Sequence, residues 1–268
     1  MEVQPVLSAK SDSFKMIFRR FCFFLCFAIA ASGCASSKLT KELETIGFEW
    51  VPISGGPFTM GDVYFEDNPD SRPVHPVQVA PFYISKYETT LDQYDWFTTK
   101  TARKQIFPEQ LDRGRRAVSN LNWTDARAFC EFIGGRLPTE VEWEFAASGG
   151  PLKQMYPGTN DEEEAEEYVR YIQNSLAEVF PVGSKQPNAF GLFDMGGNVA
   201  EWIGSFYEYY PEPGVEPVPF DLENRELRIV RGGGFSADRS VTRTYWRSGT
   251  LARVATAGIG VRCAKDVE

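Results

Sequence analysis

Glycine, proline and asparagine recur so densely after residue 150 that long regular elements are not expected in the second half of this chain. The pairs at 196–197 and 232–233 and the proline-rich stretch 209–219 interrupt any helical or alternating pattern. The chain nevertheless has 268 residues, 43% of them hydrophobic and 14% aromatic, which is enough to bury a large core. We therefore expect a few helices, short strands and much ordered loop.

Clear element signals come before residue 150. Residues 123–133 carry apolar side chains at helical spacing, and Thr124 is a suitable cap. Thr139 and Glu142 have the spacing of a capping box, which opens a further helix that ends at the glycines 149–150. The other predicted elements are a helix over 89–100 and strands over 48–53, 57–60 and 74–84.

The N-terminal segment has the pattern of an export signal. Positive charge at 16–20 precedes an apolar run over 21–31, which is too short to span a bilayer. The run leads into Ala-Ser-Gly-Cys34, which resembles a bacterial lipobox. We expect residues 1–33 to be a signal peptide, with Met16 as an alternative start, and Cys34 to carry lipid. A secreted protein with a chance cysteine is the alternative.

Domain organisation and location follow from this signal. Residues 34–46 are short, polar and charged and are predicted to be a tether, followed by one domain over 47–268. Ala35 after the cysteine resembles an outer-membrane sorting signal, so we expect a lipid-anchored protein of the bacterial cell envelope, facing the periplasm or the surface. The net charge of −9 argues against a nucleic-acid partner.

The five cysteines divide between the signal and the domain. Cys22 and Cys26 leave with the signal, and Cys34 would be lipidated. Cys130 and Cys263 remain, an even number in an oxidising compartment. A disulfide and two buried thiols are both compatible with this count.

The residue types in the chain limit which metal and phosphate sites it can form. His75 is the only histidine, which excludes a histidine-rich zinc or iron site. The glycines after Arg231 lack the Lys-Ser/Thr of a phosphate loop. Asp194 and Glu201 flank two glycines and offer the carboxylates that calcium prefers. The alternative is that Asp194 and Asn198 only satisfy turn amides.

Six blocks occur in an order that resembles one family. Residues 135–147 read Gly-Arg-Leu-Pro-Thr-Glu-Val-Glu-Trp-Glu-Phe-Ala-Ala, residues 191–202 read Gly-Leu-Phe-Asp-Met-Gly-Gly-Asn-Val-Ala-Glu-Trp, and residues 231–236 read Arg-Gly-Gly-Gly-Phe-Ser. With the blocks at 82–90, 122–130 and 258–264, they resemble the sulfatase-modifying-factor family, whose founding member is the formylglycine-generating enzyme. The resemblance covers 48–266 and implies an α+β fold of the C-type lectin type.

The resemblance implies that the family's oxidase chemistry is missing. Two cysteines five residues apart bind copper and perform the oxidation in the formylglycine-generating enzyme. The matching positions hold Ala237 and Thr242, and there is no cysteine between 131 and 262. Formylglycine-generating activity and copper are therefore not expected.

Two other features of the family are expected here. The matching cysteine pair, Cys130 and Cys263, forms a structural disulfide in the family's enzyme. The family's calcium positions correspond to Asp194, Gly197, Val199 and Glu201, the middle two through carbonyl oxygens.

Arginines crowd the C-terminal part of this acidic chain, with eight between 225 and 262. Forked guanidiniums beside aromatic rings could bind an anionic or carboxylate-bearing partner. The candidates for this are Arg239, Arg243, Tyr245, Trp246 and Arg247. The alternative is that these arginines pair with acids elsewhere and hold irregular loops together.

Three functions remain open at this point. The first is a binding or structural component of the envelope, for example of secretion or gliding machinery, with an envelope protein as partner. The second is an enzyme with cysteine-independent chemistry, with Glu201, Asp238 and Tyr245 as acid–base candidates. The third is a lectin-like displayed receptor. They predict, respectively, a large exposed apolar patch, a deep pocket with a shifted carboxylate, and a shallow aromatic and arginine surface.

Overall fold

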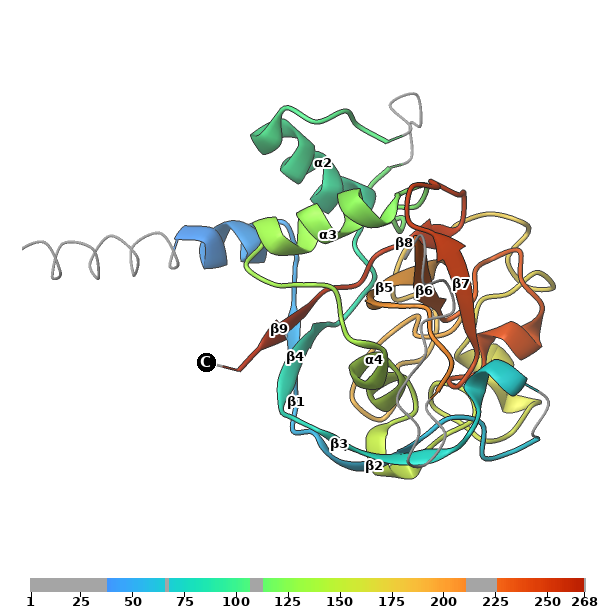
Figure 1. Cartoon of the computed structure of the whole chain (residues 1–268). Helices are drawn as coiled ribbons and strands as arrows, with labels where there is room; N and C mark the ends of the chain where they lie inside the picture. The colour runs from blue at the N-terminus through green and yellow to red at the C-terminus, as the bar shows by residue number, and fades with distance from the viewer. Residues whose placement is uncertain (1–37, 66–67, 107–112, 211–225, 268) are drawn as a thin grey trace, which may run out of the picture. The chain divides into compact units, whose positions relative to one another are not determined.

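The computed structural model describes residues 38–65, 68–106, 113–210 and 226–267 (Figure 1). The predicted signal peptide and Cys34 lie outside these residues. The chain forms two compact units, Met1–Gly47 and Phe48–Glu268. In the first unit, residues 38–45 are helical where a tether was predicted. Within the described ranges, no helix combines the length and apolar character needed to cross a membrane.

The strands of the second unit are short and form three small sheets. One has the antiparallel order β1-β4-β9, one pairs β2 with β3, and one has the order β7-β6-β5-β8, in which only β5 and β8 run parallel. Their bounds are β1 Trp50–Ile53, β2 Gly56–Met60, β3 His75–Val79, β4 Phe82–Ser85, β5 Ala200–Phe206, β6 Leu227–Arg231, β7 Arg247–Leu251, β8 Ile259–Gly260 and β9 Ala264–Asp266.

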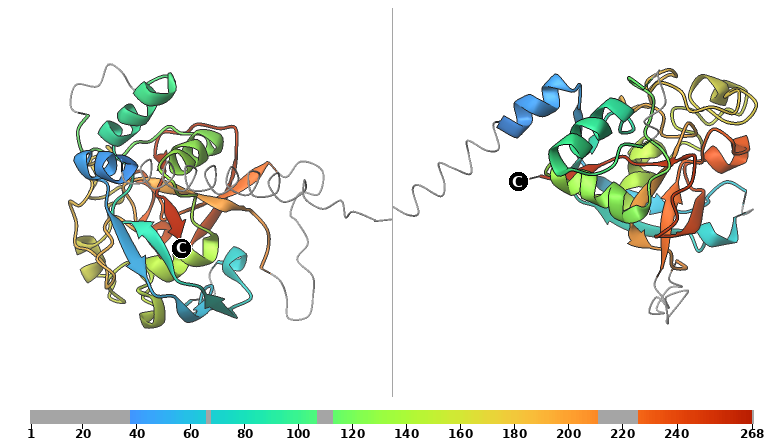
Figure 2. Two further views of the ribbon diagram at one scale, coloured as in Figure 1. Left: turned by 90° about the vertical axis from the view of Figure 1, so that its left-hand side faces the viewer. Right: turned by 90° about the horizontal axis from the view of Figure 1, so that it is seen from above.

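The predicted strand over 74–84 is wrong as a single element. It divides into β3 and β4 around Ala80 and Pro81, and proline has no backbone N–H to donate to a ladder. β1 and β2 form where expected, and they pair with β4 and β3. The two pairs therefore follow one another along a curved ribbon, as Figures 1 and 2 show.

The helices begin at side-chain caps. α2 has a capping box between Thr90 and Gln93, and α4 has the predicted one between Thr139 and Glu142. The cap of α3 is Asn122, whose side chain accepts from Asp125 N, because the expected cap Thr124 already lies inside the helix. The bounds are α2 Leu91–Thr101, α3 Trp123–Phe132, α4 Glu140–Ala147, and the 3-10 turns η1 Pro69–Ser71, η2 Gly150–Leu152, η3 Glu164–Glu167 and η4 Arg239–Thr242.

The main core surrounds α4. Trp143 and Phe145 on this helix are fully buried and join a cluster with Ile53, Phe58 and Ile203 from the strands. Six of the eight residues of α4 are buried, which leaves the helix almost no solvent face. The loops and short strands around α4 are thus held by burial of apolar surface more than by long hydrogen-bonded ladders.

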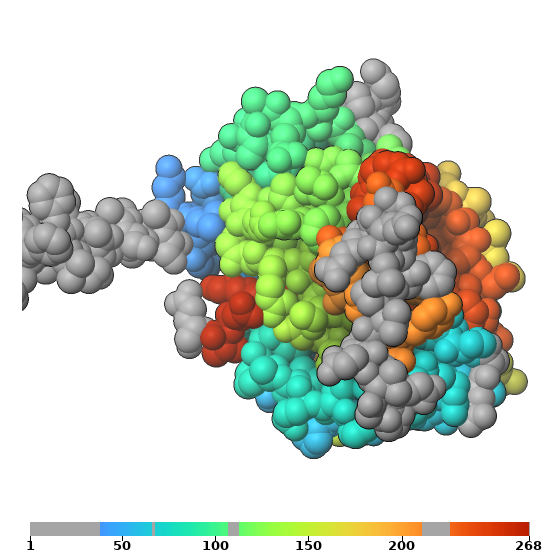
Figure 3. Space-filling model, viewed as in Figure 1, coloured from blue at the N-terminus to red at the C-terminus, as the bar shows by residue number. Residues whose placement is uncertain are grey.

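A disulfide connects α3 to the end of the chain, as predicted. Cys130 and Cys263 are fully buried and bonded, with their Cα atoms 5.4 Å apart. On the face shown in Figure 3, the region of α3 lies between α2 and the C-terminal strand β9. The observed architecture, with few helices, short strands and much ordered loop, confirms the predicted α+β class.

Candidate functional site

The block 191–202 forms a tight loop that leads into β5. Asp194 and Asn198 adopt left-handed φ values of 56° and 55°, and Gly197 has φ of +83°. A Cβ on Gly197 would lie 1.7 Å from the carbonyl oxygen of Arg170, so only glycine fits there. The glycines therefore fold the loop back, as the sequence predicted, and bring its two acids inside.

Both predicted carboxylates are buried and hydrogen-bonded. Glu201 Oε1 accepts from Arg262 Nε at 2.9 Å, and its Oε2 accepts from Trp143 Nε1 at 2.6 Å. Asp194 Oδ2 accepts from the backbone N of Gly183 at 2.6 Å. Burial raises the pKa of Glu201, and Arg262 and Trp143 offset part of that rise. Burial also raises the pKa of Asp194, against the opposing effect of the Gly183 hydrogen bond.

A third buried acid, Glu88, was missed by sequence reasoning. Its Oε1 accepts from Val199 N at 2.9 Å and its Oε2 accepts from Asn198 Nδ2 at 2.5 Å. Burial raises the pKa of Glu88 well above its ordinary value, and the charges of Asp194 and Glu201 raise it further. Glu88 lies in the block 82–90, over a hundred residues before its partners, and its sequence neighbours do not indicate that it meets them.

Calcium prefers several oxygen donors, mainly carboxylates and backbone carbonyls. In the part of the chain that the structure describes, no three His, Cys, Asp or Glu side chains are grouped as a metal site. The predicted calcium ligands include only two carboxylates, those of Asp194 and Glu201, and two backbone carbonyls. Each Glu201 oxygen accepts one hydrogen bond, from Arg262 or from Trp143, and a carboxylate has about four lone pairs. Buried carboxylates with lone pairs left over are oxygen donors of the kind that calcium prefers.

Ala237 and Thr242, which the resemblance matches to the family's oxidising cysteines, are both hydrogen-bonded within turns. Ala237 N donates to Gly234 O at 2.9 Å, and Ala237 O accepts from Ile172 N at 3.0 Å. Thr242 is fully buried at the end of η4, and its hydroxyl donates to Arg239 O at 2.7 Å. A methyl group and a hydroxyl committed to the backbone therefore stand where thiols would be needed.

The five residues expected to bind an anionic partner do not form an open surface. Arg247 is buried, and its Nε and terminal nitrogen bind the two oxygens of Glu140 at 2.6 and 2.9 Å. Tyr245 is fully buried against Tyr156. These two side chains therefore support the alternative, in which arginines and aromatics hold irregular loops together.

Of the other three candidates, Arg243 is also buried, whereas Arg239 and Trp246 are half-buried. Arg243 and Arg239 both reach the half-exposed carboxylate of Glu162, at 3.1 and 3.4 Å. Trp246 is half-buried, and its backbone N donates to Arg243 O at 3.0 Å. These arginines connect the segment around η4 to Glu162, which lies in the acid-rich stretch 161–167.

A second buried network ties β6 to α4. Arg231 donates to Glu140 Oε1 at 3.0 Å and to Glu144 Oε2 at 2.9 Å. Glu144 Oε1 also accepts from Lys153 Nζ at 2.7 Å and from Gly61 N at 2.8 Å. Burial raises the pKa of Glu144, but Lys153 and Arg231 outweigh burial and leave the pKa at about 2. The arginine of the Arg-Gly-Gly block is therefore structural.

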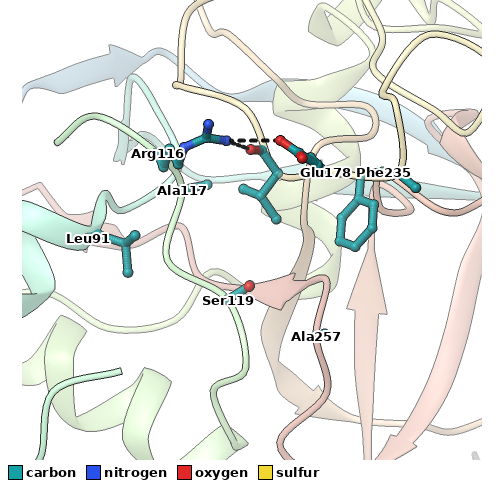
Figure 4. A pocket seen from close by; sticks show the side chains of 9 residues that line it. Leu91, Arg116, Ala117, Ser119, Glu178, Phe235 and Ala257 are labelled. Carbon is teal, nitrogen blue, oxygen red and sulfur yellow. Dashed lines mark hydrogen bonds and ion pairs between the residues drawn. The ribbon is translucent and has the colours of Figure 1, made fainter. Parts of the chain in front are cut away.

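A pocket of about 310 Å³ lies beside Phe235, the residue that follows the glycines 232–234 (Figure 4). Leu91, Val179 and Phe235 line it together with Ser119. An ion pair between Arg116 NH1 and Glu178 Oε2, 3.9 Å apart, lies along one edge. These residues come from the start of α2 and from three loops far apart in the sequence, which explains why no motif predicted the pocket.

The acid–base candidates occupy three different environments. Glu201 lies in the buried ion pair with Arg262, Tyr245 lies in an apolar cluster, and Asp238 is exposed before η4. None of the three lines the pocket beside Phe235. The arrangement does not single out a proton-transfer site.

Comparison with known proteins gives consistent matches over most of the chain. The sequence profile of the family described as "Sulfatase-modifying factor enzyme 1-like domain" matches residues 37–267. The chain is 31% identical over 256 residues to "Serine/threonine-protein kinase pkn1" of Chlamydia pneumoniae, with 87% of this chain covered. It spans only 40% of the length of that relative.

Two further matches cover nearly whole proteins. "Inactive C-alpha-formylglycine-generating enzyme 2" of Bos taurus is 30% identical over 307 residues, which cover 87% of this chain and 96% of the relative. The solved structure of PvdO from Pseudomonas aeruginosa superposes with a TM-score of 0.71 at 25% identity, over 81% of this chain and 94% of that one. The first of these matches concerns sequence, and the second shows that the α+β architecture is shared.

Proposed function

This chain is a member of the sulfatase-modifying factor enzyme 1-like family, and from this premise we propose that it binds a partner at the bacterial envelope and does not generate formylglycine. The proposal includes a lipid anchor on Cys34, on the strength of the Ala-Ser-Gly-Cys motif after an apolar run. An envelope protein is the proposed partner, and a carboxylate-bearing ligand is the second candidate.

The observation that carries the proposal is the pair Ala237 and Thr242. Neither side chain can supply a thiolate, and soft thiolates are the ligands that Cu(I) selects. The cysteines Cys130 and Cys263 cannot substitute, because both are fully buried and bonded to each other. A relative that is 30% identical over 87% of this chain carries the word "inactive" in its name, which supports the same interpretation.

A calcium ion is proposed for the loop before β5. Asp194 and Glu201 would supply carboxylates, and Gly197 and Val199 would supply carbonyl oxygens. The burial of both acids and the lone pairs left over on their carboxylates support this assignment. The ion would be structural, because the loop anchors β5 in the centre of the four-stranded sheet.

The oxidase part of the proposal can be tested directly. The purified protein is incubated with copper, oxygen and a peptide that bears the Cys-x-Pro-x-Arg target, and mass spectrometry looks for the aldehyde. We expect no aldehyde above a copper-only control. An aldehyde formed by the native protein above that control would contradict this part of the proposal.

The binding part needs a separate experiment. The tagged full-length protein is isolated from membranes, and co-purifying proteins are identified by mass spectrometry. A specific partner is expected from native membranes. Recovery of the protein alone, both with and without cross-linking, would contradict a protein partner and favour a small carboxylate-bearing ligand.

A further inference from the structure

A hydroxyl without a partner lies in the pocket beside Phe235. Ser119 is only 4% exposed, lines the pocket, and makes no hydrogen bond through its hydroxyl to any residue that the structure describes. The Ser119 oxygen is not closed off by protein atoms, so it opens on the pocket. Ser119 is therefore available to a ligand that carries a hydrogen-bonding atom into the pocket.

The other residues that line the pocket are mostly apolar, and its two charged side chains pair with each other. Leu91, Val179 and Phe235 supply aliphatic and aromatic walls. The two charged groups at the pocket, Arg116 and Glu178, pair with each other along one edge (Figure 4). A charged ligand group would lose its hydration here without gaining an opposite charge, so the lining selects an uncharged group.

The size of the pocket is compatible with an aromatic group. A volume of about 310 Å³ is within the range of ligand pockets and accommodates one aromatic ring. Phe235 offers a ring for edge-to-face or offset stacking. A phenol fulfils all three requirements, because it is aromatic, uncharged at neutral pH, and hydrogen-bonding at the tip.

The mouth of the pocket favours a ligand that continues outward. Leu176, the chain neighbour of the lining residue Ala177, is 83% exposed. Leu176 and Ala177 both hold left-handed φ values, 54° and 56°, which residues with a Cβ adopt at a cost. A free phenol would leave this apolar rim uncovered, whereas a polypeptide would cover it.

We propose that this pocket binds the tyrosyl side chain of a partner polypeptide, with the ring against Phe235 and the phenol hydroxyl bonded to Ser119. This inference rests on the proposed binding function and names the chemistry of its partner. The exposed leucine at the rim would contact the residues on either side of that tyrosine.

Four probes test the inference with the full-length protein. They are the capped tripeptides Gly-Tyr-Gly, Gly-Phe-Gly and Gly-Glu-Gly, and free p-cresol, and binding is followed by NMR titration. The tyrosyl peptide should bind roughly five-fold more tightly than the phenylalanyl peptide, which is the worth of one ordinary hydrogen bond. Ser119→Ala should reduce that ratio to about one, whereas Phe235→Ala should weaken both peptides. Ser236→Ala, an exposed serine outside the lining, should leave the ratio unchanged.

Each other outcome has a defined meaning. A tyrosyl-to-phenylalanyl ratio of one in the native protein, an unchanged ratio in Ser119→Ala, or equally tight binding of the glutamyl peptide would overturn the inference. Binding of p-cresol as tight as that of the tyrosyl peptide would overturn the polypeptide source. Failure here leaves the aldehyde assay and the recovery of a partner unaffected, so the inference and the proposed function can fail separately.

Discussion

Glu144→Gln is expected to destabilise the domain by about 3 kcal/mol at pH 7, and the loss should depend on pH. The side chain is fully buried and accepts hydrogen bonds from Gly61, Lys153 and Arg231. The amide keeps the shape of the side chain but removes the charge that compensates two buried cations. The variant therefore isolates the electrostatic contribution with little change in packing.

The magnitude follows from the pKa of this carboxyl. Burial alone would raise the pKa, but the two cations bring it from 4.5 to about 2. At about 1.4 kcal/mol per pKa unit, this difference corresponds to roughly 3 kcal/mol of stabilisation of the charged form. The removal of one partner from a buried ion pair typically costs about 3–5 kcal/mol, which agrees with this value.

The sign of the pH dependence is fixed by the direction of the change. Because the pKa of Glu144 is lower in the folded state than in the unfolded state, its stabilisation is complete above pH 4.5. It is lost as the pH falls through about 2, where the folded state also takes up the proton. The difference in unfolding free energy between native protein and variant should thus be largest at neutral pH and mostly closed at pH 2.

Urea unfolding with the disulfide intact, repeated between pH 7 and pH 2, measures this difference. Glu131→Gln is the matched control, because the Glu131 side chain is 52% exposed and pairs with Arg127 on the surface of α3. Its effect should stay below about 0.5 kcal/mol. Equal destabilisation by the two variants at pH 7, or a Glu144→Gln effect that persists undiminished at pH 2, would refute the reasoning.

Three further predictions concern the disulfide, the calcium ion and the anchor. Reduction of Cys130–Cys263, which are 133 residues apart, should lower the unfolding free energy by about 5 kcal/mol, and labelling of the unfolded, unreduced protein should find neither cysteine free. Calcium should raise the melting temperature, and Glu201→Ala should abolish most of that rise; a native melting temperature that ignores both calcium and chelator contradicts the site. Cys34→Ser should release the protein from membranes, and a processed variant that stays membrane-bound would argue against lipidation.

Local chemistry explains which parts of the fold could be predicted. The capping box from Thr139 to Glu142 satisfies helix-end amides within four residues, so the sequence alone contains the whole signal. The cap of α3 was misplaced by two residues because both Asn122 and Thr124 are good caps, and only Asn122 lies outside the helix with an extended backbone. The division at Pro81 was missed because the apolar alternation continues across it.

Contacts between side chains far apart in the sequence could not be predicted in the same way. Glu88 joins Asp194 and Glu201 only through the fold, and the pocket combines Leu91 with Phe235 across most of the domain. The turn in the block 191–202 could nevertheless be predicted, because its glycines permit a close backbone approach that other residues would block. A sequence thus shows where a backbone must turn, but not which distant side chains meet there.

The arginines show why a charge pattern must be weighed against the kind of fold that contains it. In a domain with little regular structure, many loop carbonyls have no ladder partner and need donors from elsewhere. Arg247 donates to the carbonyls of Asp70 and Glu208, at 3.0 and 2.7 Å, in addition to its bond with Glu140. Arg262 does the same for Ser85 and Phe193, at 2.8 and 2.7 Å.

A planar guanidinium with five donors suits this task, since it can join three segments and a carboxylate at once. Arginines buried in this way are unavailable to a ligand. Recognition by this domain therefore has to come from groups that the loops leave unused. In the pocket beside Phe235, the group that fulfils this condition is the hydroxyl of Ser119, a residue that is 4% exposed, lines the cavity, and makes no side-chain hydrogen bond within the described ranges of the chain.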